Sequence, residues 1–309
     1  MSSYLMLHNS ILDVIGQTPI VRLEKLSTDL GVEVFVKLES LNPGGSHKAR
    51  IALGMILDAE RKGILVRGTQ QTIIEPSGGN TGIGLVMAGN VLGYKVVLVI
   101  PDNYSPEKQK LLRLYGAEVV LSDSRLGNNS HGQKAMELQL ENPRYVMLNQ
   151  QRNAANPETH RQGTAREIVR AFAGRRIDYF VGGIGTGGHI TGIGEILKAT
   201  WPAIRVLGVE PEECDLLNDQ HAPHQIQGLS IGIVPSILNL SVLDGMLKVS
   251  KDQCLEMMQR VMRTDAISLG LSSAANLVAI ATLAKEMPEH STVLTMVYDS
   301  ADAYLPLFE

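Results

Sequence analysis

Short apolar runs alternate along this chain with longer segments in which apolar residues recur every three or four positions. The short runs are typical of buried β-strands, and the longer segments are typical of helices that bury one face. The pattern predicts strands at residues 18–21, 34–38, 72–74, 95–100, 118–121, 177–181, 204–209 and 293–297. It predicts helices at residues 83–91, 106–115, 157–172, 190–199 and 273–285, among others.

This alternation indicates an α/β protein in which mostly parallel sheets are wrapped by helices on both faces. A chain of 309 residues is long enough for two such doubly wound lobes. We therefore expect an N-terminal lobe over residues 1–149 and a C-terminal lobe over residues 150–309. Ligand sites often lie between lobes, so we expect a site in the cleft where the lobes meet, near residues 145–156.

Composition narrows the class of protein and its surroundings. Hydrophobic residues make up 44% and charged residues 19% of the chain, and the net charge is −4, which is ordinary for a soluble globular protein. This charge, without any basic run, argues against nucleic acid as a partner. The cysteines, Cys214 and Cys254, fit a reducing cytoplasm, and no apolar run of 18 residues suggests a membrane span. His221 and His224 have no obvious third ligand, so we expect no metal site.

The segment 42–50, with the sequence NPGGSHKAR, follows a predicted strand and places Lys48 in the first turn of an expected helix. Gly44 and Gly45 let the backbone approach a ligand closely, and a helix start leaves main-chain N–H groups without helical partners. A partly desolvated lysine amine can lose its proton and attack a carbonyl carbon. A single lysine after a loop is more often an ordinary surface residue, so this interpretation depends on the other motifs.

Two further glycine-rich loops each join a predicted strand to a predicted helix. The loop at residues 75–82, EPSGGNTG, offers hydroxyl, amide and main-chain N–H groups that suit a carboxylate or phenolate oxygen, although a plain turn has a similar composition. The loop at residues 182–189, GGIGTGGH, is typical of an anion cradle at a helix N-terminus and predicts phosphate binding. Gly183, Gly185 and Gly188 also match the dinucleotide fingerprint, with Glu210 about 20 residues further on, so a nicotinamide-dependent enzyme stays open.

The order of these motifs resembles the cysteine synthase and cystathionine β-synthase family, the fold-type II enzymes that depend on pyridoxal 5'-phosphate (PLP). The similarity runs from about residue 15 to residue 307, and it rests on the segments 42–50, 77–82, 150–157, 185–188 and 269–273. The resemblance implies two mostly parallel-sheet lobes with PLP in the cleft. It also implies that the early strands, at about residues 12–40, join the C-terminal lobe.

The resemblance implies roles for individual residues. Lys48 corresponds to the lysine that holds PLP as an imine and then acts as the catalytic base, and Ser272 to a serine at the pyridine nitrogen. The cofactor-binding residues that it implies are Lys48, Asn80, Gly185, Thr186, Gly187, Gly188, His189 and Ser272. The substrate-binding residues that it implies are Ser77, Gly78, Gly79, Asn80, Thr81, Gln150 and Gly228.

The reaction that the resemblance implies is β-replacement. PLP is an electron sink that makes the Cα proton of a bound amino acid acidic, and Lys48 would remove that proton. Loss of a β-leaving group would give an aminoacrylate, which a second nucleophile attacks. We therefore expect a transferase or lyase that converts O-acetylserine or O-phosphoserine into L-cysteine or a related β-substituted alanine. The family also implies a homodimer with a small amino-acid substrate.

Several residues depart from the family pattern around the substrate. Gly78 stands where the family usually has serine, Gln151 replaces an aromatic residue, and His189 replaces a phosphate-binding threonine. Ser230 and Ile231 stand where smaller residues are usual. We expect these changes to affect the preferred donor or acceptor rather than the cofactor.

Other functions stay open at this point. The same scaffold would suit a cystathionine β-synthase, a sulfide-releasing cysteine lyase or a specialised amino-acid synthase. An NAD-dependent dehydrogenase is a more distant alternative that rests on the glycine fingerprint. Loss of turnover with retention of PLP is conceivable because Gly78 lacks the usual hydroxyl. The leaving group, the incoming nucleophile and the pathway do not follow from the sequence.

Overall fold

The computed structural model describes residues 7–127 and 129–308. Within it the chain forms two compact units. The four-stranded unit consists of the residues up to Gly16 and of Asn42–Ala155. The six-stranded unit consists of Gln17–Leu41 and of the residues from Asn156 onward. No helix of the described part of the chain has the length and hydrophobicity needed to cross a membrane.

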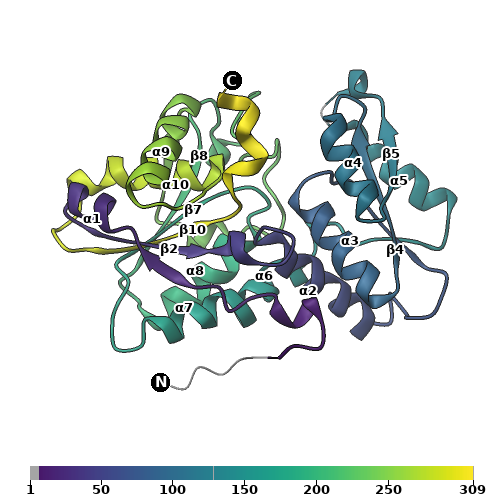
Figure 1. The fold of residues 1–309 in the computed structure, drawn as a ribbon, viewed down its shortest axis with the longest axis horizontal. Coiled ribbons are helices and arrows are strands. Elements are labelled where there is room, and N and C mark those ends of the chain that lie inside the picture. Colours follow the sequence, from purple (N-terminus) through teal and green to yellow (C-terminus); the bar gives the residue numbers. More distant parts are fainter. Residues whose placement is uncertain (1–6, 128, 309) are drawn as a thin grey trace. The chain divides into compact units, whose positions relative to one another are not determined.

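The six-stranded unit is built on one mixed sheet. Its strands, in spatial order, are β1 (Ile20–Arg22), β2 (Glu33–Leu38), β10 (Thr292–Val297), β7 (Tyr179–Gly183), β8 (Arg205–Pro211) and β9 (Gly245–Val249). β1 pairs antiparallel with β2, and every other pairing is parallel. Its longer helices are α1 (Glu24–Leu30), α7 (Ala165–Ala171), α8 (Gly188–Thr200), α9 (Lys251–Thr264) and α10 (Leu271–Leu283). Figure 1 shows α9 and α10 on one face of this sheet and α7 and α8 on the other.

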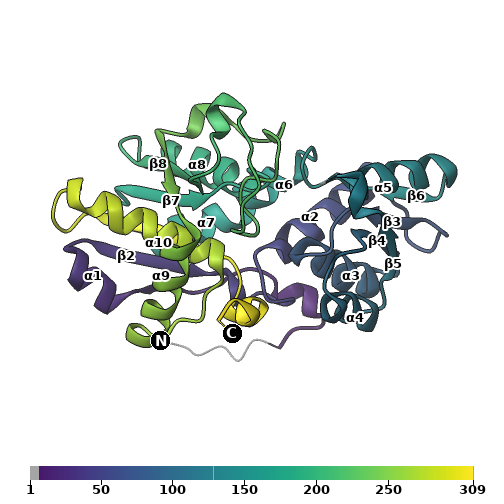
Figure 2. The ribbon, with the colours of Figure 1, turned by 90° about the horizontal axis from the view of Figure 1, so that it is seen from above.

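The four-stranded unit has a wholly parallel sheet in the order β5 (Glu118–Ser122), β4 (Lys95–Pro101), β3 (Thr72–Glu75) and β6 (Tyr145–Met147). Its helices are α2 (Lys48–Arg61), α3 (Asn80–Leu92), α4 (Pro106–Leu114) and α5 (Ser130–Glu141). Alternate strand residues enter different cores: Ile73 and Leu98 pack with α2 and α3, whereas Ile74 and Val97 pack with Ala135 of α5. Figure 2 shows α5 and the α3–α4 pair on opposite sides of this sheet.

Shorter helical segments connect or flank these strands and helices. A helix, α6 (Ala155–Thr159), starts where the two units divide and continues through a π-helical turn (His160–Thr164) into α7. The 3₁₀ segments are Ile11–Val14, Glu39–Leu41, Ser124–Leu126, Leu216–Asn218, Leu240–Val242, Ala284–Glu286 and Ala301–Phe308.

The predicted fold class is confirmed, because both sheets are mostly parallel and carry helices on both faces. Eight strands were expected near their observed positions, but β6 and β9 were not expected. Both strands are only partly buried; β6 is three residues long, and Lys248 interrupts the apolar residues of β9. Helices α3 and α8 begin earlier than predicted, at Asn80 and Gly188, because glycine-rich first turns lack the apolar periodicity of a helix.

The side chain of Lys37, a residue of β2, is a charged group buried inside the six-stranded unit. Lys37 is fully buried, and its Nζ lies 2.7 Å from Glu167 Oε2 of α7 and 4.0 Å from Glu39 Oε1. The same amine donates to the carbonyl oxygen of Thr18 at 2.9 Å, and the Thr18 hydroxyl donates to Glu39 at 2.6 Å. A buried ion is tolerated when it is paired and hydrogen-bonded in this way.

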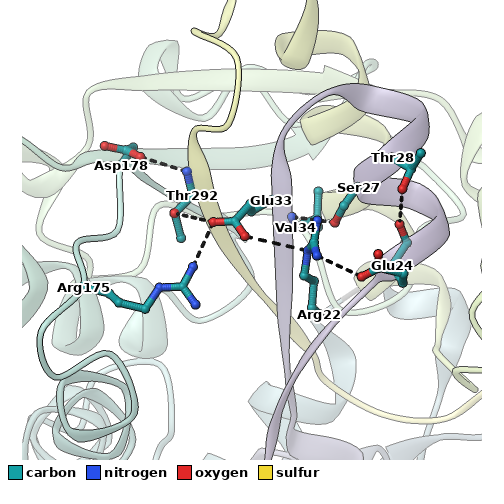
Figure 3. Close-up of polar contacts among 9 residues, drawn as sticks. All are labelled: Arg22, Glu24, Ser27, Thr28, Glu33, Val34, Arg175, Asp178 and Thr292. Atoms are coloured by element: carbon teal, nitrogen blue, oxygen red, sulfur yellow. Dashed lines mark hydrogen bonds and ion pairs between the residues drawn. The ribbon is translucent and has the colours of Figure 1, made fainter.

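A second polar network lies at the amino-terminal edge of the same sheet (Figure 3). Glu33, the first residue of β2, accepts hydrogen bonds from Arg175 at 2.8 Å and from the Thr292 hydroxyl at 3.4 Å. Asp178 accepts from the main-chain N–H of Thr292 at 2.8 Å, and Arg22 Nε lies 3.9 Å from Glu33. These contacts join the starts of β2, β10 and β7 at this edge, so the loops at the carboxyl ends of the strands take no part in them.

Replacing Lys37 with Met should destabilise the protein by about 3–5 kcal/mol, because Glu39 and Glu167 would lose the cation that compensates their burial. Urea denaturation of the apoprotein, followed by circular dichroism, measures this change. Lys198 is the matched control, since its pair with Asp244 is partly exposed, and Lys198→Met should cost less than about 1 kcal/mol. Equal losses for the two variants would contradict a special role for the buried pair.

Candidate active site

Lys48 is the first residue of α2, directly after the glycine pair. Gly44 and Gly45 have φ values of 79° and 76°, a left-handed conformation that favours glycine. The main-chain N–H of Lys48 is 3.3 Å from Ser46 Oγ. A Cβ placed on Gly84 would lie 3.2 Å from the Lys48 carbonyl oxygen, so this position allows the start of α2 to pack closely on α3. The Lys48 side chain is half-buried.

The loop between β3 and α3 is folded tightly on itself. A Cβ placed on Gly82 would lie 2.4 Å from the carbonyl oxygen of Ser77, so only glycine permits this approach. Gly79 is the N-cap of α3 and supplies no side-chain hydrogen bond to the helix. The first-turn N–H groups of α3 therefore lie beside the hydroxyls of Ser77 and Thr81, as an anion-binding loop requires.

Gln150 meets this loop from the segment that follows β6. The Thr81 hydroxyl donates to Gln150 Oε1 at 2.6 Å. The structure thus brings together Ser77, Thr81 and Gln150, three of the residues predicted to bind the substrate.

Glu75 holds the Gln150 segment in place. It is the last residue of β3 and is 1% exposed. Its carboxylate accepts the main-chain N–H groups of Asn149 at 2.8 Å and of Gln150 at 2.9 Å. Burial raises the pKa of Glu75 to about 7, and these hydrogen bonds oppose the rise. Glu75 was not among the predicted site residues, although a carboxylate that ends a buried strand is a visible signal in the sequence.

The six-stranded unit contributes an anion cradle at the start of α8. Gly187 is the N-cap of α8 with φ 78°, and no side chain caps the helix. A Cβ placed on Gly188 would lie 2.0 Å from Asn156 Oδ1, and Asn156 Nδ2 donates to Thr186 Oγ1 at 3.2 Å. The uncapped N–H groups, the Thr186 hydroxyl and the helix dipole form a set of donors that fits a phosphate group.

The other predicted cofactor residues of this unit lie beside the cradle. A Cβ placed on Gly185 would lie 2.3 Å from the carbonyl oxygen of Gly228. One placed on Gly228 would lie 4.0 Å from Ser272 Oγ. Ser272 is the second residue of α10. The structure thus brings Gly185, Gly228 and Ser272 together within this unit, and a side chain at position 185 would collide with the main chain of Gly228.

His189 directs one ring nitrogen into the interior of the unit. Its Nε2 lies 2.9 Å from the hydroxyl of Tyr298. That hydroxyl also accepts the main-chain N–H of Gly183 at 2.9 Å and Asn276 Nδ2 at 3.2 Å. Both lone pairs of the hydroxyl are then used, so its proton goes to His189 Nε2. That nitrogen accepts a hydrogen bond here and does not donate one to an anion.

Ser230 has an unusual conformation next to the cradle. Its φ is 41°, which is uncommon for a residue other than glycine. Its N–H donates to the Ile184 carbonyl at 2.8 Å, and its carbonyl oxygen lies 3.1 Å from His224 Nε2. The Ser230 hydroxyl is buried and has no hydrogen-bond partner among the described residues; a strained backbone together with an unpaired polar group is often found at ligand sites.

The described residues contain no group of three or more His, Cys, Asp or Glu side chains that could hold a metal ion. His221 pairs with Asp219 at 2.9 Å. Glu210, which the dinucleotide fingerprint would place on a ribose, accepts the main-chain N–H of Leu216 at 2.8 Å, and burial raises its pKa.

Comparison with known proteins identifies the class to which this site belongs. The family model described as "Pyridoxal-phosphate dependent enzyme" matches residues 11–299, and the chain belongs to this family. Cysteine synthase of Staphylococcus aureus is 41% identical over 303 residues, which cover 97% of each chain.

O-ureido-L-serine synthase of Streptomyces lavendulae is 41% identical over 303 residues, covering 98% of this chain and 92% of that one. The crystal structure of an O-ureido-L-serine synthase matches with a TM-score of 0.93 at 41% identity, covering 97% of this chain and 94% of that one. The protein is therefore a PLP-dependent enzyme of the cysteine synthase type. This result decides against the dehydrogenase that the glycine fingerprint left open.

The raised pKa of Glu75 predicts how stability depends on pH. Relative to the unfolded chain, a carboxyl group with a raised pKa favours folding below about pH 4.5, and this contribution is lost as the pH rises through about 7. From pH 4.5 to 7.5, the unfolding free energy of the wild type should therefore fall relative to Glu75→Gln, by on the order of 3 kcal/mol. Urea denaturation of both apoproteins at several pH values measures this difference.

Glu60 provides a control because its pKa is shifted in the opposite direction. Hydrogen bonds from Arg67 lower its pKa, so its contribution is lost only as the pH falls below about 4.5. The difference between wild type and Glu60→Gln should stay constant from pH 4.5 to 7.5. A constant difference for Glu75→Gln over the same range would contradict the interpretation of Glu75.

Proposed function

We propose that this enzyme catalyses β-replacement on an activated L-serine, O-acetyl-L-serine or O-phospho-L-serine, and forms L-cysteine or a related β-substituted alanine. The observation that carries the proposal is the anion cradle at α8 with Gly228 and Ser272 beside it, a set of groups that fits PLP. The reaction class is supported by cysteine synthase and O-ureido-L-serine synthase homologues at 41% identity.

The six-stranded unit would hold the phosphate and the ring nitrogen of the cofactor. Main-chain N–H groups of Gly185, Gly187, Gly188 and His189, with the Thr186 hydroxyl, would bind the phosphate. The Nε2 of His189 is engaged with Tyr298, so this ring nitrogen takes no part, and we assign the main-chain N–H of His189 to this role. The Ser272 hydroxyl would face the pyridine nitrogen. A neutral hydroxyl there would not favour ring protonation, in contrast to a carboxylate.

In the four-stranded unit, Lys48 would carry the covalent link to the cofactor through Nζ. When bound, PLP supplies an electron sink that acidifies the Cα proton of the amino acid. Lys48 Nζ, released from the link, would accept that proton and hold it above Cα.

The loop from Ser77 to Thr81 and Gln150 would bind the substrate. The α-carboxylate would accept the first-turn N–H groups of α3 and the hydroxyls of Ser77 and Thr81. The Gln150 amide would donate to the same carboxylate, while its Oε1 accepts from Thr81. Gly78 and Gly79 would allow close approach, and Asn80 would donate to the phenolate oxygen of the cofactor. Because Gly228 has no side chain, the substrate could approach its main chain closely.

The finer parts of the proposal concern assembly and specificity. We propose a homodimer in the cytoplasm that acts on small amino acids, as the family resemblance implies. Ser230, Ile231 and Gln151 support a donor or acceptor that differs from O-acetylserine with sulfide. Cystathionine formation, sulfide release from cysteine and synthesis of a specialised amino acid are the alternatives within the same scaffold.

Borohydride reduction of the purified yellow enzyme, followed by peptide mapping, should place a pyridoxyl group on Lys48. The reduction makes the covalent link permanent, so the labelled residue identifies the lysine that holds the cofactor. Lys48→Ala should lose the label. Lys62→Ala, at the other end of the same helix, should keep it. A label on another lysine, or a colourless protein that binds NAD, would overturn the assignment.

A matrix of donors and acceptors tests the reaction itself. Steady-state turnover should be measured for O-acetylserine, O-phosphoserine, serine and cysteine against sulfide, homocysteine, cyanide and amines. We expect an O-activated serine to be the preferred donor, with an acceptor other than sulfide giving the highest kcat/KM. If O-acetylserine with sulfide has by far the highest kcat/KM, the plain cysteine synthase assignment stands and the altered residues are neutral. Absence of turnover with every pair would contradict β-replacement.

A further inference from the structure

The space beside Gly78 is filled by the side chain of another loop. A Cβ placed on Gly78 would lie 2.9 Å from Cζ and 3.0 Å from Cε1 of Tyr104, and 2.7 Å from Cγ2 of Ile100. Contacts of this length do not occur for real Cβ atoms without a shift of the neighbour. The serine that the family resemblance leads us to expect at position 78 therefore cannot coexist with Tyr104 in this position.

Tyr104 is held in place by its own segment. It follows β4, whose last residue, Pro101, accepts the Tyr104 N–H at 3.1 Å. Gln109 Nε2 donates to the Tyr104 carbonyl oxygen at 2.9 Å, and Lys108 Nζ lies 5.6 Å from the centre of the ring, within the range of a cation–π contact. Because β4 pairs in parallel with β3, the loops after these strands lie at the same edge of the sheet.

The phenolic hydroxyl reaches the loop proposed to bind the substrate. It lies 3.9 Å from a Cβ placed on Gly79. It makes no hydrogen bond to any residue in the described part of the chain. Burial raises the pKa of Tyr104, so at neutral pH the hydroxyl keeps its proton and can donate it.

We propose that Tyr104 is a substrate-binding residue whose hydroxyl replaces the one missing at Gly78 and donates to an oxygen of the bound amino acid. This inference rests on the proposed function, since it takes the Ser77–Thr81 loop as the amino-acid site. The oxygen belongs either to the α-carboxylate or to the ester of the donor. A hydroxyl on a rigid aromatic ring differs from a serine hydroxyl in its reach and in the direction of its hydrogen bond. Tyr104 therefore determines which amino-acid substrate the loop binds.

Tyr104→Phe tests the hydroxyl in the PLP-loaded enzyme. Binding of O-acetyl-L-serine, L-serine and L-alanine is measured from the change in the visible spectrum of the cofactor. We expect roughly tenfold weaker binding, the effect of losing one hydrogen bond to a charged or carbonyl oxygen. Thermal midpoint and PLP content should not change, because the hydroxyl bonds to no residue that the structure describes. Tyr115→Phe, a half-exposed tyrosine at the end of α4, is the matched control and should bind like the wild type.

The three amino acids distinguish the two oxygens that could accept the hydrogen bond from Tyr104. Equal weakening for all three assigns the acceptor to the α-carboxylate, and weakening for O-acetyl-L-serine alone assigns it to the ester; both support the proposal. Unchanged binding of all three would overturn it. If the enzyme carried no PLP band at all, the proposed function would fail first, and that failure is visible before any amino acid is added.

Variants at positions 78 and 104 test whether the Tyr104 ring occupies the space of the missing side chain, and the stability measurements need no cofactor. Gly78→Ser should lower the thermal midpoint of the apoprotein when Tyr104 is present. In a Tyr104→Ala background the same change should be much better tolerated, because the ring is gone and Ile100 can turn into its space. The double variant, loaded with PLP, should recover part of the binding that Tyr104→Ala loses. Equal destabilisation by Gly78→Ser in both backgrounds would show that Tyr104 does not occupy the position of the missing side chain.

Discussion

Parallel strand pairing is the constraint on which the candidate ligand loops of each unit depend. In a parallel sheet the carboxyl ends of neighbouring strands lie at one edge, so the loops that follow them meet there. In the four-stranded unit, this brings the segments after β3, β4 and β6 together, and with them Ser77, Tyr104 and Gln150. In the six-stranded unit, Gly270, just before α10, donates to Asp299 after β10, while Tyr298 binds Gly183 at the end of β7.

The glycines of these loops are explained by the protein before any ligand is considered. A Cβ on Gly82, Gly185 or Gly188 would meet a main-chain carbonyl or an asparagine oxygen at 2.0–2.4 Å. The loops can only close in this way if these residues have no side chain. The closure in turn leaves the first-turn N–H groups of α3 and α8 without side-chain caps. The capacity to bind an anion that we propose for these loops therefore follows from how each strand is joined to its helix.

Much of this arrangement could be predicted from the sequence. Continuous apolar runs identified the buried strands, and the order of motifs identified the family and its cofactor. The contacts of Glu75, Tyr104 and Tyr298 could not be predicted. Each of them acts on a residue that is distant in the sequence, and neither hydrophobic periodicity nor local spacing carries that information. Glu75 contacts the segment after β6, a strand of three residues that is too short to stand out in the pattern.

Gly78 illustrates why a departure from a family motif should be interpreted together with its neighbours in space. Taken alone, the missing hydroxyl suggests a weakened or inactive site. The structure places Tyr104 and Ile100 of the adjacent strand and loop in the vacated space, so the loss at one strand end is matched by a gain at the next. Packing that is this close makes the two positions interdependent. The chemistry at this strand edge then depends on the combination, and the changes at Gly78 and Tyr104 are better understood as one linked change than as separate defects.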